Sequence, residues 1–473
     1  MLFNSYEFLV VFLPLTVLGY YAVLLGGGRQ PALAWLVLTS LAFYGWWEPG
    51  HLWLIGFSLL ANYTCGHLIT RGSGGAFWLV IGVGFNLALL GYYKYAGFLI
   101  DSSTTVMGLQ PSVLQILLPL AISFFTFQQI GFLVDCRRGQ TQPPKLLDYL
   151  LFVTFFPQLI AGPIVQHRQV ISQFRNLSRR VPWESIARGV TLFSLGLFKK
   201  VMIADKLAEW ATGGFDLVAG GQAVGMADAW GATLAYTFQL YFDFSGYSDM
   251  ALGLGALFGI RLPRNFDSPY QATSIGQLWN RWHITLSHFL RDYLFLPLGG
   301  SHRRHPVVTF RNLMITMTLC GLWHGAGWAF VLFGAIHGLL MSVHHFWRLH
   351  IRSRYDWRMP APVAWLLTFG SFALTLVLFR SSSVAAAGRM YQALLGWETS
   401  LAANGLLSWA DWSRILLMFP LVLCVPNAVR LVNGECSNWR WRPQPAYAAM
   451  AAAMVAWCLL RLNDNSEFLY FHF

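Results

Sequence analysis

Two histidines in apolar surroundings are the side chains of this sequence best suited to chemistry. His324 lies in the run GLWHGAGW at 321–328, and His283 lies in WNRWH at 279–283. An ionisable side chain inside a membrane segment is by default a site hypothesis, and imidazole suits proton transfer near neutral pH. We interpret His324 as a general base for an acceptor nucleophile or a proton donor to a leaving thiolate. The alternative is a histidine that bonds a backbone carbonyl and fixes a helix break.

A tryptophan precedes each of these histidines. Trp282 and Trp323 could therefore help to position a substrate or donor. His283 could act in catalysis, orient His324 or bind a carrier group, with a buried structural histidine as the alternative. His337 follows His324 by 13 residues, which on one continuous helix is a different face. We expect His337 to pack or to support the site.

Two carboxylates lie in a third apolar run. Asp243 and Asp249 belong to YFDFSGYSD at 241–249. Because an unpaired carboxylate within a membrane costs roughly a few kcal/mol, each should have a partner, and Arg281 and Arg291 are the candidates. We assign these four residues to substrate positioning, with a structural ion pair or a helix-break clamp as the alternative.

The composition is that of a membrane protein. Of the 473 residues, 56% are hydrophobic and 11% are charged, whereas soluble domains average about 25% charged residues. The net charge of +12 comes from short loops between apolar runs, which the positive-inside rule explains without any nucleic-acid partner. The 13 histidines and six cysteines form no metal-ligand pattern, so we expect no bound metal.

About eleven apolar runs approach the length that crosses a bilayer, roughly 20 residues. We predict an all-α polytopic membrane protein that forms a single domain over 1–473, with its catalytic core at about 226–347. The expected spans are 8–26, 31–47, 51–70, 76–99, 112–134, 189–213, 226–259, 313–347, 361–380, 412–430 and 445–460.

Three segments do not look like simple spans. Residues 146–165 lie between basic loops that should share one face, so we expect a re-entrant segment broken near Pro157 and Gly162. Residues 277–298 show apolar and polar side chains at helical spacing, which predicts one amphipathic helix at the membrane face. The aromatic tail at 467–473 is too short to span, so we expect it to dock at an interface.

The stretch 313–347 is long enough to cross a bilayer nearly twice. Basic residues lie before and after it, so the chain should enter and come back on the same side. Gly325 and Gly327 are the expected break. This arrangement would place His324 within the membrane, on irregular backbone that faces a cavity.

Several of these runs together resemble the membrane-bound O-acyltransferase family. They are QLYFDFSGYSDMA at 239–251, WNRWHITLS at 279–287, LRDY at 290–293, LGG at 298–300 and GLWHG at 321–325. The likeness continues nearly end to end, through GYYKY at 91–95 and FPQLIAGP at 156–163. It is strongest to the branch of bacterial alginate, peptidoglycan and cellulose O-acetyltransferase membrane subunits.

The resemblance implies an activity and a set of partners. The family's essential histidine corresponds to His324 and its second histidine to His283. The fold should be a ring of helices and re-entrant helices around a central funnel, where a cytoplasmic acyl donor meets its acceptor. In this branch a membrane subunit passes acetyl groups to a periplasmic SGNH-type transferase. We therefore expect a multi-pass O-acetyltransferase subunit of the bacterial inner membrane that serves an exported polysaccharide, with acetyl-CoA or another acyl thioester as donor and no bound cofactor.

Two other functions stay open at this point. Broken helices and buried charges also mark transporters, so a polytopic transporter without acyl-transfer chemistry is one alternative. A D-alanyl transferase of the same family, acting on teichoic acids, is the other. The sequence does not choose among alginate, cellulose and peptidoglycan as the polysaccharide.

Overall fold

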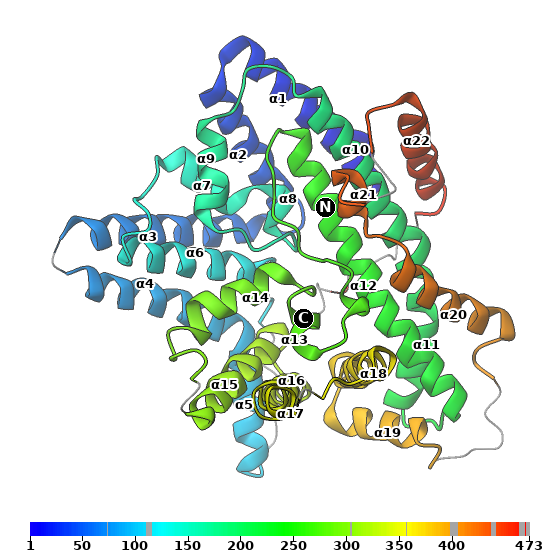
Figure 1. Ribbon diagram of the computed structural model, residues 1–473. Helices are drawn as coiled ribbons and strands as arrows, with labels where there is room; N and C mark the ends of the chain where they lie inside the picture. Colours follow the sequence, from blue (N-terminus) through cyan, green and yellow to red (C-terminus); the bar gives the residue numbers. More distant parts are fainter. Residues whose placement is uncertain are drawn as a thin grey trace. The chain divides into compact units, whose positions relative to one another are not determined.

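The computed structural model describes residues 1–72, 74–109, 116–302, 305–355, 357–397, 405–436, 441–462 and 469. Every regular element in these ranges is a helix (Figure 1), which confirms the all-α prediction. The chain forms two compact units: unit 1 comprises 1–197, 247–264 and 441–465, and unit 2 comprises 198–246, 265–440 and 466–473. The helix α12 (Met226–Leu257) contributes residues to both. A single domain over 1–473 stays a prediction.

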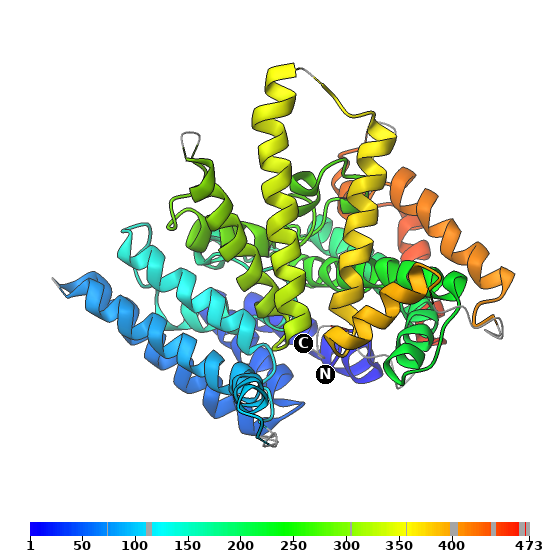
Figure 2. The same ribbon diagram turned by 90° about the horizontal axis from the view of Figure 1, so that it is seen from below.

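Unit 1 contains the N-terminal helices. In both views α3, α4 and α6 lie side by side (Figures 1 and 2). Phenylalanine rings from distant segments form its aromatic core, where Phe3, Phe43 and Phe156 approach within 5.4–6.4 Å between centroids. Its helices are α1 (Leu13–Gly27), α2 (Arg29–Gly45), α3 (Leu52–Arg71), α4 (Gly75–Leu90), α5 (Ala96–Val106), α6 (Ile122–Arg137), α7 (Leu146–Thr154), α8 (Phe156–Leu159), α9 (His167–Arg175), α10 (Trp183–Phe198) and α22 (Pro445–Leu459).

The segment 146–165 is a broken helix, as expected. Phe155 separates α7 from α8 with extended backbone, and Pro157 follows within the first turn of α8, where proline is tolerated. The Phe156 N–H, which the break leaves without a helical acceptor, donates to Ser40 Oγ over 3.1 Å. A Cβ on Gly162 would lie 2.4 Å from Gln158 Cα, so only glycine fits this turn. Re-entry into a membrane stays a prediction.

Unit 2 is organised around the hairpin of α15 and α16. A Cβ on Gly321 would lie 2.2 Å from Phe330 O, and one on Gly334 would lie 2.3 Å from Met317 O. The two backbones therefore touch, which small residues permit between membrane helices. In both views α18 lies beside α16 (Figures 1 and 2). The helices are α11 (Asp205–Ala219), α13 (Ile275–Trp279), α14 (Ile284–Leu290), α15 (Pro306–His324), α16 (Trp328–Phe346), α17 (Ser353–Tyr355), α18 (Ala361–Arg380), α19 (Val384–Leu394), α20 (Trp409–Cys424) and α21 (Ala428–Asn433).

The α15–α16 hairpin confirms the break predicted for 313–347. Helix α15 ends at His324, and α16 begins at Trp328. A Cβ on Gly325 would lie 2.1 Å from the Phe330 ring, so the glycine makes room for that ring at the reversal. The chain reverses there, and His324 occupies the last helical position before the break, so the expectation of irregular backbone at His324 was wrong. The position of His324 within a membrane stays a prediction.

The prediction of one amphipathic helix over 277–298 is wrong. The segment breaks between α13 and α14, and His283 has left-handed backbone with φ +43° and ψ 53°. The predicted apolar side is nevertheless buried, with Trp279, Trp282 and Leu286 inside. The spacing of apolar residues in the sequence correctly predicted which side chains are buried. It could not predict the interruption of the helix at His283, because hydrogen bonds to a distant segment cause it.

Six helical stretches in the described residues are long and apolar enough to cross a membrane. Each overlaps an expected span, so the chain is a polytopic membrane protein. Other expected spans coincide with helices of fewer than 18 residues, such as α2 and α22. Part of the span expected at 112–134 falls outside the described residues, and α6 begins at Ile122. A total of about eleven spans and a central funnel stay predictions. The six stretches are Glu7–Gly27, Pro49–Arg71, Gly75–Val106, Trp328–Tyr355, Ala361–Arg380 and Trp409–Asn433.

Candidate active site

The backbone around His283 is held by the segment that follows α12. The Ile284 N–H donates to Asn265 O over 2.9 Å, and the Asp267 N–H donates to Arg281 O over 2.9 Å. These two bonds join 265–267 to 281–284. A left-handed conformation at a residue other than glycine costs of the order of 1–3 kcal/mol and persists where the surroundings over-determine it. The paired backbone provides that constraint at His283.

The side chain of Asn265 fixes the tautomer of His283. Asn265 Oδ1 accepts from the Thr285 N–H over 3.3 Å and from the Thr285 hydroxyl over 2.9 Å. A backbone N–H needs an acceptor, so this atom is the amide oxygen. His283 Nδ1 lies 3.1 Å from the same oxygen and must therefore donate its proton to it. The neutral ring then carries its basic lone pair on Nε2.

His283 is fully buried. Burial lowers the pKa of His283 from 6.5 to about 3, because a charged imidazole loses its hydration there. The Phe244 ring meets the imidazole edge-on at 4.8 Å between centroids, and the Trp323 ring lies 6.0 Å away. A neutral imidazole with a fixed tautomer can accept a hydrogen bond or a proton through Nε2.

His324 is placed by the C-terminal turn of α15, and 5% of it is exposed. Its ring lies 4.9 Å from the Trp323 ring and 5.2 Å from the Phe379 ring. Its Nε2 lies 4.0 Å from Cys320 Sγ, one helical turn earlier. The Trp323 ring thus contacts both candidate histidines. The structure brings together three of the predicted site residues: His283, Trp323 and His324.

His337 packs among other side chains, as expected from its position. It is fully buried. The Trp279 indole donates to Nδ1 over 3.3 Å, and Nε2 lies 3.0 Å from Thr375 Oγ1, whose hydroxyl proton goes to Phe372 O. Nε2 therefore donates to Thr375, and both ring nitrogens are used. The His337 ring also lies 4.5 Å from the Phe333 ring between centroids. The Phe333 ring in turn lies 6.4 Å from the His324 ring.

The partners predicted for Asp243 were wrong. Its Oδ1 lies 2.7 Å from Lys200 Nζ, which also contacts Asp205 Oδ1 over 2.7 Å. Lys200 and Asp243 are nearly completely buried, so the interaction is a buried ion pair. The Leu469 N–H donates to Asp243 Oδ2 over 3.3 Å. That contact agrees with docking of the tail, whose other residues from 467 to 473 lie outside the described residues.

The two arginines have other contacts. Arg291 pairs with the adjacent Asp292, Nε to Oδ1 at 2.7 Å, and its side chain is 53% exposed. Arg281 Nη1 approaches Ser268 O at 3.5 Å. Both lie on the polar side of a segment whose apolar side is buried. Their roles in positioning stay predictions.

Trp282 and Asp249 are two further residues that were predicted for the site. Trp282 packs in an aromatic cluster, 5.1 Å from the Phe266 ring and 5.2 Å from the Phe372 ring. Asp249 is buried in unit 1. Six residues along an α-helix turn the side chain by about 240°, so Asp249 and Asp243 point in different directions from α12. A role for Asp249 in the site stays a prediction.

Sequence reasoning missed two residues that position the site. Lys200 lies inside the expected span 189–213, and a buried cation there was itself a signal that an acidic partner exists. Asn265 lies in the loop RNFDSPY at 264–270, and nothing in its spacing connects it to His283. That contact depends on the paired backbone between 265–267 and 281–284.

Comparisons with known proteins agree with this arrangement. The model of the family described as "MBOAT, membrane-bound O-acyltransferase family" matches residues 135–383, a range that contains His283, His324 and Asp243. The chain is 36% identical to the peptidoglycan O-acetyltransferase of Helicobacter pylori, over 100% of this chain and 98% of that protein. It is 42% identical to the probable alginate O-acetylase AlgI of Pseudomonas putida, over the whole of both chains.

A further relative is more distant. The teichoic acid D-alanyltransferase of Streptococcus thermophilus is 30% identical over 48% of this chain and 57% of its own. The family match and the end-to-end likeness to proteins named for O-acetyl transfer decide between an enzyme and a transporter. The chain is an acyltransferase and belongs to the membrane-bound O-acyltransferase family.

Proposed function

We propose that this protein transfers an acetyl group from a cytoplasmic thioester donor toward an exported cell-surface polysaccharide. The observation that carries the proposal is the buried pair of imidazoles, His283 and His324, both in contact with Trp323. End-to-end similarity to a peptidoglycan O-acetyltransferase and to alginate O-acetylases supports acetyl over alanyl transfer. The D-alanyltransferase relatives share only about half of the chain.

In the proposed reaction an acceptor hydroxyl attacks the carbonyl carbon of the thioester. A carbon–oxygen bond forms, the carbon–sulfur bond breaks, and His324 takes the hydroxyl proton and passes it to the departing thiolate. His283 accepts a hydrogen bond through Nε2 and orients the acceptor or the donor. Acetyl-CoA is the proposed donor, since the cationic loop at 261–311 would attract its phosphates.

The proposed acceptor of the acetyl group is a partner of the SGNH type on the outer side of a bacterial inner membrane. That partner would carry its own serine and complete transfer to the polysaccharide. Alginate, peptidoglycan and cellulose are the candidate glycans, and the choice among them belongs to the partner.

Purified protein with radiolabelled acetyl-CoA tests the donor. We expect thiol release when the partner and its glycan are present, and a loss of release in His324→Ala. His350→Ala removes an exposed imidazole of the same chain and should behave as the wild type. Absence of thioester cleavage in the complete mixture would contradict acetyl-CoA as donor. Equal release by His324→Ala and wild type would contradict the role of His324.

A further inference from the structure

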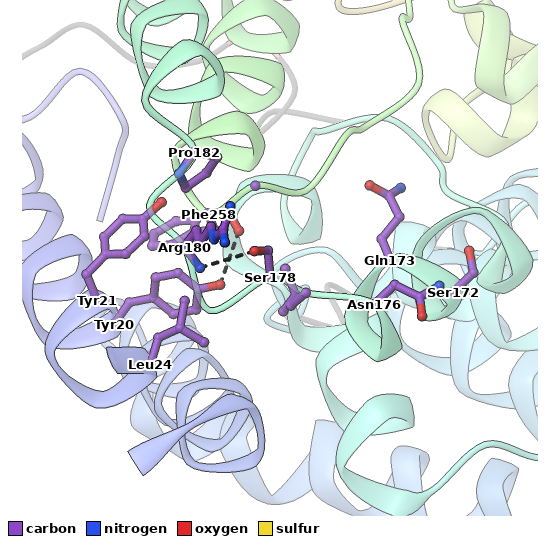
Figure 3. A pocket seen from close by; sticks show the side chains of 12 residues that line it. Tyr20, Tyr21, Leu24, Ser172, Gln173, Asn176, Ser178, Arg180, Pro182 and Phe258 are labelled. Carbon is purple, nitrogen blue, oxygen red and sulfur yellow. Dashed lines mark hydrogen bonds between the residues drawn. The ribbon is translucent and has the colours of Figure 1, made fainter. Parts of the chain in front are cut away.

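A pocket in unit 1 is lined by none of the residues of the candidate active site. Its volume is about 340 Å³, within the range of roughly 300–1,000 Å³ that small-molecule sites occupy. Figure 3 shows Tyr20, Tyr21 and Arg180 on one side and Gln173 and Asn176 on the other. The pocket lies where α1, α9 and α12 end. Its lining is Tyr20, Tyr21, Leu24, Ser172, Gln173, Asn176, Leu177, Ser178, Arg180, Pro182, Phe258 and Gly259.

The helix ends around this pocket would by themselves favour a cation, because C-terminal carbonyls carry partial negative charge. Four of these carbonyls already have donors from side chains. The Tyr21 hydroxyl donates to Leu257 O over 2.7 Å, and the Tyr20 hydroxyl donates to Phe258 O over 3.2 Å. Guanidinium groups take two more, Arg179 with Leu25 O over 3.3 Å and Arg29 with Arg175 O. These four carbonyl oxygens are therefore not available to a cation.

Two of the polar side chains that remain can donate hydrogen bonds to a ligand. The Gln173 amide is occupied, since it accepts from Arg261 N over 2.8 Å and donates to Arg261 O over 2.9 Å. The guanidinium of Arg180 and the side-chain amide of Asn176 make no hydrogen bond or ion pair with other described residues. No acidic residue lines the pocket. A planar guanidinium on one side of the pocket and an amide on the other can both donate to a phosphate or carboxylate group held between them.

The position of the pocket relative to the membrane surface indicates where its anionic ligand comes from. Along α1 the exposed side chains are apolar, with Leu18 69% and Leu25 53% exposed, and the helix ends at Gly27 just before Arg29. This change from apolar to basic marks a membrane–water interface on the positively charged side. Leu24, Pro182 and Phe258 give the pocket an apolar wall beside its donors. We propose that the pocket binds the phosphate of an anionic membrane phospholipid through Arg180 and Asn176.

The test uses full-length protein in a neutral detergent, titrated with dihexanoyl phosphatidylglycerol and, as the matched neutral lipid, dihexanoyl phosphatidylcholine. Affinity is measured from the rise in apparent melting temperature. Arg180→Gln removes the charge, and Ser172→Trp fills the pocket while every charge is kept. Arg71→Gln is the control, because it removes an exposed arginine from the end of another span in unit 1. Coenzyme A is titrated in parallel.

We expect phosphatidylglycerol to stabilise the wild type and Arg71→Gln, and phosphatidylcholine to have little effect. Arg180→Gln should bind phosphatidylglycerol at least about tenfold more weakly, the loss expected for one charge-assisted hydrogen bond. Ser172→Trp should weaken binding at least as much, because the indole takes the space of the lipid headgroup. Equal affinities in all four proteins, or no response to phosphatidylglycerol, would overturn the proposal. An Arg180-dependent response to coenzyme A but not to the lipid would also overturn it, in favour of a soluble phosphate ester.

Discussion

Asn265 and His283 make the most closely specified contact of the candidate site. One amide oxygen accepts three hydrogen bonds, and the histidine has a single tautomer as a result. The tautomer of the histidine that would act chemically is thus set by the side chain of Asn265. Catalysis depends strongly on such positioning, because small misplacements of a reacting group are costly.

Asn265→Ala should lower activity by about 10- to 100-fold with the protein still in the membrane. The substitution frees the His283 ring to rotate and leaves the Thr285 donors without their acceptor. The measurement is the rate of acetyl transfer at equal protein level. Asn280→Ala, on an exposed neighbour of the same segment, is the control and should keep the wild-type rate. Wild-type activity in Asn265→Ala would mean that the tautomer of His283 is irrelevant.

The low pKa of His283 also predicts a dependence of stability on pH. Its pKa is about 3 in the folded protein, against 6.5 ordinarily. Between these values the unfolded chain binds a proton that the folded protein does not, so stability falls as the pH drops below 6.5 and this effect ends near pH 3. At pH 5 the loss from this one group is about 2 kcal/mol.

His283→Gln removes this contribution and keeps a side chain of similar length. The apparent melting temperature should therefore fall less between pH 7.5 and pH 5 in this variant than in the wild type. The comparison is made in one detergent, with each protein as its own reference at pH 7.5. The same fall in both proteins would show that His283 is not the buried neutral group that the account requires.

At the scale of elements, the α15–α16 hairpin places His324. Gly334→Ala should destabilise the protein by about 1–3 kcal/mol, since its Cβ would lie 2.3 Å from the backbone oxygen of Met317. Gly370→Ala on α18 is the matched control, because nothing lies within 4 Å of that Cβ. It should be neutral or stabilising by up to ~1 kcal/mol. Equal melting temperatures for the two variants would contradict the close packing of α15 on α16.

The ion pair of Lys200 with Asp243 makes a second prediction about how helices are held. Lys200→Met leaves a buried carboxylate without its cation, which costs about 3–5 kcal/mol. Lys206→Met breaks an exposed pair with Glu209, whose side chains are 47% and 60% exposed, and should cost under about 1 kcal/mol. Thermal unfolding of both variants measures the difference. Adding Asp243→Asn to Lys200→Met removes the unpaired charge and should restore part of the lost stability. If the double variant is no more stable than Lys200→Met, the broken ion pair is not the cause of the destabilisation.

The sequence predicted the elements better than the contacts between them. Apolar run length identified α18 at 361–380 residue for residue, and the glycines at 325 and 327 identified the reversal after His324. The break at His283 was missed, because an uninterrupted helical pattern covers it and only the pairing with 265–267 opens it. Arg281 and Arg291 were chosen for Asp243 by charge alone, whereas the partner is a lysine already buried within an expected span.

At the scale of the whole molecule, the similarity to O-acetyltransferases extends over the entire chain, well beyond the histidines. The family model itself spans 135–383 and so includes residues 135–197 and 247–264 of unit 1 and most of unit 2. Motifs at 239–251, 279–287 and 321–325 predicted the family because each combines rare residue types in a fixed order. Six apolar helices agree with a polytopic protein. The motifs do not identify the acyl donor, the partner protein or the glycan that is modified.

The most direct measurement compares His324→Ala with the wild type in the source organism. Ester-linked acetate is quantified on each isolated surface glycan, and the membrane level of the protein is checked in parallel. The account predicts that one glycan loses its acetate at equal protein level, and the identity of that glycan names the substrate class. Unchanged acetate on every glycan, with His324→Ala present at the normal level, would contradict the assignment of His324 to acyl transfer.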